Sequence, residues 1–116
     1  MFKIITRAFK QNLFRNISGE DITMQELKKK QAQGALVVDV RNNREFSEGH
    51  IKGSINIPEY EINRKFQMYV PNKNEVIVLY CTSGKRSKSA LKKIKKMGYV
   101  KAYNLYGGLE NYWLRY

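Results

Sequence analysis

Short hydrophobic runs alternate along the chain with segments of helical spacing. Residues 36–40 are mostly β-branched and residues 76–80 are almost wholly apolar, as is typical of strands buried in a parallel sheet. Residues 102–105 are a third candidate strand, and residues 54–57, ahead of Pro58, are a weaker fourth. Alternation of this kind predicts an α/β fold with a central, mainly parallel sheet flanked by helices.

Helix signals fall between the expected strands. Thr23 and Glu26 have the spacing of a capping box, which marks the start of a first helix. Residues 61–69 could form a short second helix, and residues 87–97 place their apolar side chains on one face of a third. After the last strand, two glycines indicate a turn into a short terminal helix that carries Trp113.

Composition limits what this fold can contain. The chain has 116 residues, enough for one domain with its own core. Its single cysteine excludes an intramolecular disulfide, and with a single histidine it cannot form a structural zinc site. We therefore expect no metal and no cofactor. The 22 basic and 10 acidic residues give a net charge of +12, which suits nucleic acid, a membrane surface or an anionic substrate equally well.

Part of the positive charge lies at the N-terminus. We interpret residues 1–20 as a basic amphipathic leader and residues 21–116 as the domain. A helix or arm packed on its own domain is the favoured reading of the leader, and a peripheral membrane contact by residues 1–16 is left open. The leader has no continuous apolar stretch of the secretory kind and the chain no paired cysteines, so we expect a cytoplasmic protein.

A larger share of the charge lies in residues 85–101, which hold eight basic residues and no acidic one. Four lysines at helical spacing share an exposed face: Lys88, Lys92, Lys95 and Lys96. A solvated surface is the favoured interpretation, and docking of RNA or of an acidic protein is the alternative. No interleaved aromatic pattern accompanies these lysines, so nucleic acid is not the expected partner.

The only cysteine, Cys81, follows the central strand and begins a loop that leads into a helix. The next five residues are Thr82, Ser83, Gly84, Lys85 and Arg86. Sites in open α/β sheets form at the carboxyl ends of strands, and a glycine-containing loop at a helix N-terminus directs several amides to one point. Such a nest binds anions and favours thiolate over thiol. Cys81 is therefore a candidate nucleophile, although an inert buried cysteine is the alternative.

Several motifs together resemble the rhodanese family. They are residues 37–41, Glu45 with Phe46, residues 49–51, residues 53–58, the segment from Cys81 to Ser87, and residues 105–108 with Trp113. The order and spacing match over about residues 21–116. The resemblance implies the rhodanese-like three-layer α/β fold and a sulfurtransferase that carries sulfane sulfur as a persulfide of Cys81.

The resemblance also implies roles for other residues. Thiosulfate or a persulfide would be the donor, bound by residues 82–86, and the acceptor would be cyanide, a thiol or a protein. Asp39 and Arg41 would brace the active-site loop, and Glu45 would make helix-end contacts without chemistry. His50 would fix a turn rather than transfer protons.

Two other functions stay open. Dual-specificity phosphatases and arsenate reductases of the same superfamily resemble Cys-x5-Arg, whereas Cys81 and Arg86 are one residue closer together. The shorter loop favours sulfur transfer over phosphatase or arsenate reductase activity. A rhodanese-like interaction or regulatory module with little catalysis is the other alternative.

Overall fold

Five parallel strands form the central sheet, in the order β1-β5-β4-β2-β3. Their bounds are Asp21–Ile22 (β1), Leu36–Asp39 (β2), Ile55–Asn56 (β3), Ile77–Tyr80 (β4) and Ala102–Leu105 (β5). The computed structural model describes residues 19–113, without the side chain of Trp113. The expected α/β fold with a mainly parallel sheet is confirmed. The predicted leader lies almost wholly outside the described residues.

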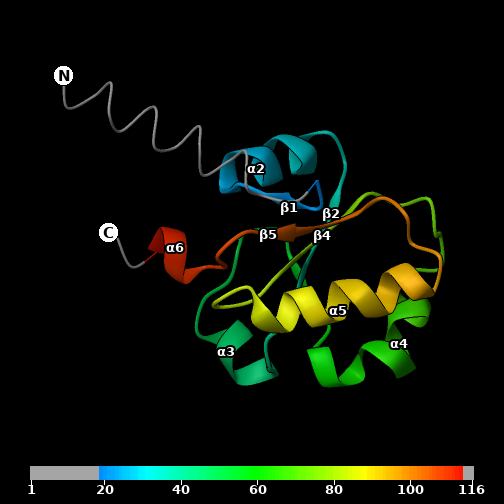
Figure 1. Ribbon diagram of the computed structural model, residues 1–116. Coiled ribbons are helices and arrows are strands. Elements are labelled where there is room, and N and C mark those ends of the chain that lie inside the picture. The colour runs from blue at the N-terminus through cyan, green and yellow to red at the C-terminus, as the bar shows by residue number, and fades with distance from the viewer. Residues whose placement is uncertain (1–18, 114–116) are drawn as a thin grey trace.

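Helices cover both faces of the sheet (Figure 1). They are α2 (Met24–Ala32), α3 (Asn43–Ser47), α4 (Ile62–Tyr69), α5 (Lys85–Lys96) and α6 (Glu110–Trp113), with a 3₁₀ turn η1 at Glu59–Glu61. Alternate residues of β4 point to opposite faces, so Ile77 and Leu79 pack with α4 and α5, while Val78 and Tyr80 pack with Leu27 of α2. This gives the three layers expected from the resemblance.

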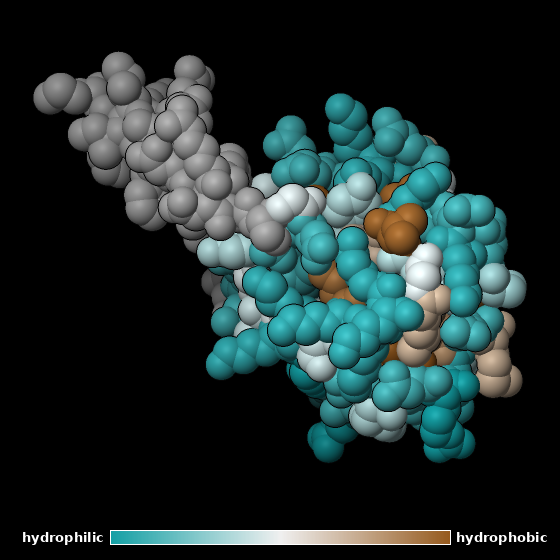
Figure 2. Space-filling view, turned by 45° about the vertical axis from the view of Figure 1, so that its right-hand side comes forward, coloured by the Kyte–Doolittle hydropathy of each residue, from teal (hydrophilic) through white to brown (hydrophobic). Residues whose placement is uncertain are grey.

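The large hydrophobic residues exposed among residues 19–113 are Tyr60, Met68, Tyr69 and Val100. Figure 2 shows a largely hydrophilic face with scattered hydrophobic side chains. Across residues 19–113, no helix combines the length and apolar character needed to cross a membrane.

The observed elements follow the predicted ones closely, with three differences. The predicted capping box is present, because the Glu26 amide donates to Thr23 Oγ1 and the Thr23 amide to Glu26 Oε1. The two-residue strand β1 was not predicted, and helix α3 was expected only through the helix-end contacts of Glu45, because neither element is long enough to show a periodic pattern. Helix α5 begins at Lys85 and not at Ser87, since Gly84 adopts a left-handed φ of 94° that turns the loop directly into the helix.

Candidate active site

The Cys81 loop, residues 81–86, joins the carboxyl end of β4 to the first turn of α5. Cys81 is fully buried. Its Sγ accepts hydrogen bonds from the backbone amides of Gly84 at 3.1 Å and Ser87 at 3.4 Å, and the Ser87 hydroxyl oxygen lies 3.4 Å away. The loop thus wraps around the sulfur and presents hydrogen-bond donors to it.

Further amides of the same loop are free. The backbone N–H groups of Thr82, Ser83, Lys85 and Arg86 donate no hydrogen bond to any residue between 19 and 113. Those of Lys85 and Arg86 belong to the first turn of α5, where a helix has no internal acceptors for its amides. The positive end of the helix dipole adds to these donors, so the loop is equipped to bind a small anion.

A glycine turn packs directly on the Cys81 loop. The amide of Leu109 donates to the carbonyl of Cys81 at 2.9 Å, and that of Glu110 to the carbonyl of Thr82 at 3.0 Å. A Cβ at Gly108 would lie 2.4 Å from the Thr82 oxygen, and Gly108 has a positive φ of 68°. Only glycine allows this close approach of two backbone segments.

Arg86, predicted to bind substrate, lies in an ion pair with Glu45 of α3. Its Nη1 and Nη2 donate to the two Glu45 carboxylate oxygens at 2.7 and 3.0 Å, and Nη2 lies 3.3 Å from Thr82 Oγ1. These bonds, aided by the capping bond from the Asn42–Glu45 box, lower the pKa of Glu45 to about 2, and Glu45 in turn raises the pKa of Arg86. Glu45 largely balances the charge of Arg86. The neighbouring Lys85 is exposed and has no ion pair among residues 19–113.

Glu45 is therefore more than a helix-end residue. It closes the capping box of α3 and also binds the Cys81 loop. The Asn42-x-x-Glu45 spacing could have revealed the cap, but no local pattern indicates its pairing with Arg86, 41 positions away.

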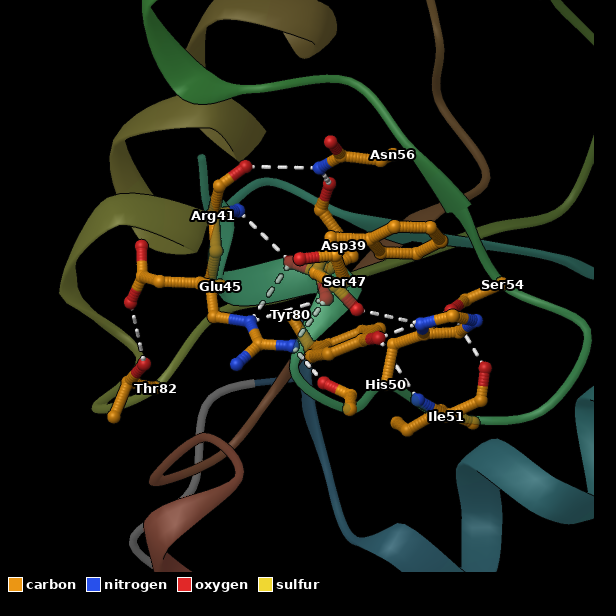
Figure 3. A network of polar contacts seen from close by, with 12 residues as sticks. Asp39, Arg41, Glu45, Ser47, His50, Ile51, Ser54, Asn56, Tyr80 and Thr82 are labelled. Atoms are coloured by element: carbon orange, nitrogen blue, oxygen red, sulfur yellow. Dashed lines mark hydrogen bonds and ion pairs between the residues drawn. The ribbon is translucent and has the colours of Figure 1, made fainter. Parts of the chain in front are cut away.

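Asp39 and Arg41 form a buried ion pair after β2 (Figure 3). Arg41 Nε lies 3.1 Å from both carboxylate oxygens of Asp39, and Nη2 donates to Oδ2 at 2.7 Å and to the Gly49 carbonyl at 2.6 Å. Burial lowers the pKa of Arg41, but the Asp39 carboxylate outweighs burial and holds that pKa above its usual value. The pair ties together residues 39–49, the segment that presents Glu45 to the loop. Direct bracing of the Cys81 loop by this pair stays a prediction.

The turn after α3 contains the only histidine. His50 Nδ1 lies 2.7 Å from the Phe46 carbonyl, and its ring stacks on the Phe46 ring at 3.7 Å. Next to it, the Tyr80 hydroxyl accepts from the Ile51 amide and bonds to Ser54 Oγ, while burial raises the pKa of Tyr80 (Figure 3). These contacts are those of a turn, the role expected for His50.

A chain of buried polar side chains leads away from Cys81 on the other side. The Ser87 hydroxyl donates to Asn104 Oδ1 at 2.5 Å, and Asn104 Nδ2 donates to Asp21 Oδ1 at 3.0 Å. Lys88 Nζ lies 3.4 Å from Asp21 Oδ2. This chain was not predicted from the sequence, because β1, β5 and helix α5 bring its members together from distant parts of the sequence.

Comparison with known proteins assigns the class. The family model of the rhodanese-like domain matches residues 23–115, and the chain belongs to that family. Thiosulfate sulfurtransferase PspE of Escherichia coli K12 is 35% identical over 74 residues, covering 64% of this chain and 70% of PspE. The human single-domain sulfurtransferase TSTD1 superposes with a TM-score of 0.71 at 30% identity, covering 84% of this chain and 97% of TSTD1.

A similar segment is found inside a larger protein of another name. The tRNA uridine(34) hydroxylase of Teredinibacter turnerae is 33% identical over 81 residues, which cover 66% of this chain and 25% of the hydroxylase. The relatives support rhodanese-type sulfur transfer as the general chemistry, with a sulfur donor and an acceptor as partners.

Proposed function

We propose that the protein is a sulfurtransferase that moves sulfane sulfur from thiosulfate, or from a persulfide donor, to a thiophilic acceptor through a persulfide of Cys81. The observation that carries this proposal is the set of four amides in the Cys81 loop that have no partner among residues 19–113, next to the only cysteine of the sequence. A nucleophilic sulfur in an anion-binding loop suits a reaction in which donor, intermediate and leaving group are all anions.

In the first step the Cys81 thiolate attacks the outer sulfur of thiosulfate. A bond forms between Sγ and that sulfur, the bond from that sulfur to the sulfonate breaks, and its electron pair leaves with sulfite. The product is Cys81–S–S⁻, so one negative charge stays in the loop. The free amides can stabilise the anionic donor during attack and the terminal sulfur afterwards.

In the second step the acceptor attacks the terminal sulfur. Cyanide takes it as thiocyanate, or a thiolate of a small molecule or protein takes it as a persulfide, and the electron pair of the broken bond returns to Cys81 Sγ. Neither transfer step needs a general base once the attacking nucleophile is an anion. The two steps predict ping-pong kinetics.

The loop cations have different roles in this proposal. Lys85 is exposed and unpaired by the described residues, so it would draw the anionic donor toward the loop. Arg86 would act mainly through loop shape, since its guanidinium bridges Glu45 and Thr82. An Arg held this way is also poorly placed to clamp a phosphate or arsenate, which disfavours those alternatives.

The test is to mix the protein with thiosulfate and weigh it intact. We expect a gain of one sulfur atom that cyanide removes, and we expect a Cys81→Ser variant to gain nothing and to lose at least about 10³-fold in thiosulfate:cyanide transfer. Circular dichroism of the variant checks that the fold is retained. No mass gain would overturn the persulfide and favour an interaction module, and activity retained by Cys81→Ser would remove Cys81 from the mechanism.

A further inference from the structure

The hydroxyl group of Ser87 has one proton and three neighbours that can accept it. Ser87 Oγ lies 2.5 Å from Asn104 Oδ1, 3.1 Å from the Gly84 carbonyl oxygen and 3.4 Å from Cys81 Sγ. A hydroxyl donates to one acceptor in a good geometry and offers its lone pairs elsewhere. The direction of this single proton decides whether Ser87 is a donor or an acceptor toward Cys81.

Asp21 determines the orientation of the Asn104 amide. A carboxylate only accepts hydrogen bonds, so the Asn104 group at 3.0 Å from Asp21 Oδ1 must be the NH₂. The amide oxygen then has to face Ser87. A reversed amide would place two acceptor oxygens against each other at Asp21, in a site where both side chains are buried.

We propose that Asp21 and Asn104 form a positioning pair that directs the Ser87 proton away from Cys81, so that Ser87 accepts the proton of the resting Cys81 thiol. The proposal rests on the proposed role of Cys81 as sulfur carrier. The hydrogen-bonded series Asp21–Asn104–Ser87 orients the Ser87 hydroxyl but does not conduct a proton to the surface, because the Asn104 amide does not relay protons.

Forming the thiolate therefore has a conformational component. When Cys81 loses its proton to solvent, Ser87 stabilises the thiolate only by rotating its own proton from Asn104 to the sulfur. A charged acceptor gives the stronger bond, but the short bond to Asn104 is then lost. In the persulfide Sγ has no proton and little charge, so the bond to Asn104 is kept. The bond between Ser87 and Asn104 therefore disfavours the thiolate of Cys81 but not its persulfide.

Other charged groups around the sulfur do not depend on this rotation. Arg86 on α5 acts on Cys81 electrostatically and is itself paired with Glu45 of α3. Lys88 on α5 faces Asp21 of β1, and Asp39 lies at the end of β2 beside β4. These charges stay in place in the variants described next, except where Asp21 is changed.

The chain has one cysteine, so [3-¹³C]cysteine labelling gives a single NMR resonance whose pH titration reports Cys81 alone. We expect Asn104→Leu to lower the midpoint of the thiol-to-thiolate titration by about 0.5 to 1 pH unit, as one hydrogen bond released to the thiolate would do. In a Ser87→Ala background the same substitution should leave the midpoint unchanged. An Asn104→Leu variant with an unchanged or raised midpoint, or one with the same shift in both backgrounds, would overturn the proposal.

Asp21→Asn gives a second route if Asn104→Leu does not fold. The new amide can donate as well as accept, so Asn104 is free to turn, and the midpoint should fall further with Ser87 present than in the Ser87→Ala background, where only the lost charge of Asp21 acts. An equal effect with and without Ser87 would contradict the positioning role. The titration uses no sulfur donor, so it is independent of whether thiosulfate adds mass to the protein, and the two proposals can fail separately.

Discussion

Two loops leave the sheet at the same edge, but their hydrogen bonding differs. Strands β2 and β4 pair in parallel with Asp39 beside Tyr80, so residues 40–50 and the Cys81 loop leave the sheet side by side. The first loop is held by side-chain bonds of its own, among them the Asp39–Arg41 ion pair and the capping box of α3. The second keeps four amides without partners among residues 19–113.

The difference shows how the fold separates support from binding. Asp39 and Arg41 are buried, their side chains pair with each other and with the Gly49 carbonyl, and Asn56 binds both of their backbone carbonyls. The Cys81 loop can leave amides free because its shape is held from outside, by Glu45 on one side and by the turn at Gly108 on the other. The supporting segment, residues 40–50, and the Cys81 loop with its free amides are thus adjacent but chemically distinct.

The largest effect should come from breaking the Asp39–Arg41 ion pair of the first loop. Arg41→Met would leave the Asp39 carboxylate buried without its partner, and we expect the free energy of unfolding to fall by about 3–5 kcal/mol in urea denaturation. The double variant Asp39→Asn with Arg41→Met removes both charges and should recover part of the loss. A single-variant loss below about 1 kcal/mol would show that the pair does not support this loop.

A smaller effect is expected from a steric clash with the Cys81 loop. Gly108→Ala would drive a methyl group against the carbonyls of Thr82 and Cys81 at a positive φ, and should cost about 2–4 kcal/mol together with most sulfur transfer. Gly34→Ala is the matched control, because Gly34 has a φ of 101° but open space around its Cβ position. The control should lose only about 1 kcal/mol and keep its activity. Equal losses would mean that the close approach at Gly108 is unimportant.

The smallest effect concerns the contact between the two loops. Glu45 has a pKa of about 2 in the folded protein, below its usual 4.5, so its pairing stabilises the fold above pH 4.5 and is lost as the pH falls toward 2. Solvent screening around half-exposed Arg86 reduces the contribution to about 1 kcal/mol. Glu45→Gln should therefore flatten the stability profile between pH 4.5 and 2. An unchanged acid slope would assign that slope to other carboxylates, with Glu45→Gln/Arg86→Gln as the test of coupling.

Sequence reasoning recovered what depends on neighbouring residues. Strands such as 77–80, the capping box at Thr23 and the placement of Cys81 before a glycine-containing loop are all local patterns. The pairing of Glu45 with Arg86 and of Asn104 with Asp21 could not be read in this way, because their side chains meet only after the sheet has formed. The bounds of helix α3 could not be predicted, since five residues show too little periodicity.

The position of Glu45 makes helix α3 and the Cys81 loop one cooperative unit. Its Oε1 accepts from the Asn42 amide at the helix start and from Arg86, while Oε2 accepts from Arg86 and Thr82. A helix of five residues is too short to persist alone, so α3 depends on the carboxylate that the loop also requires. Local unfolding of α3 would therefore release Arg86 and Thr82 from Glu45, so the stiffness of the Cys81 loop depends on this short helix.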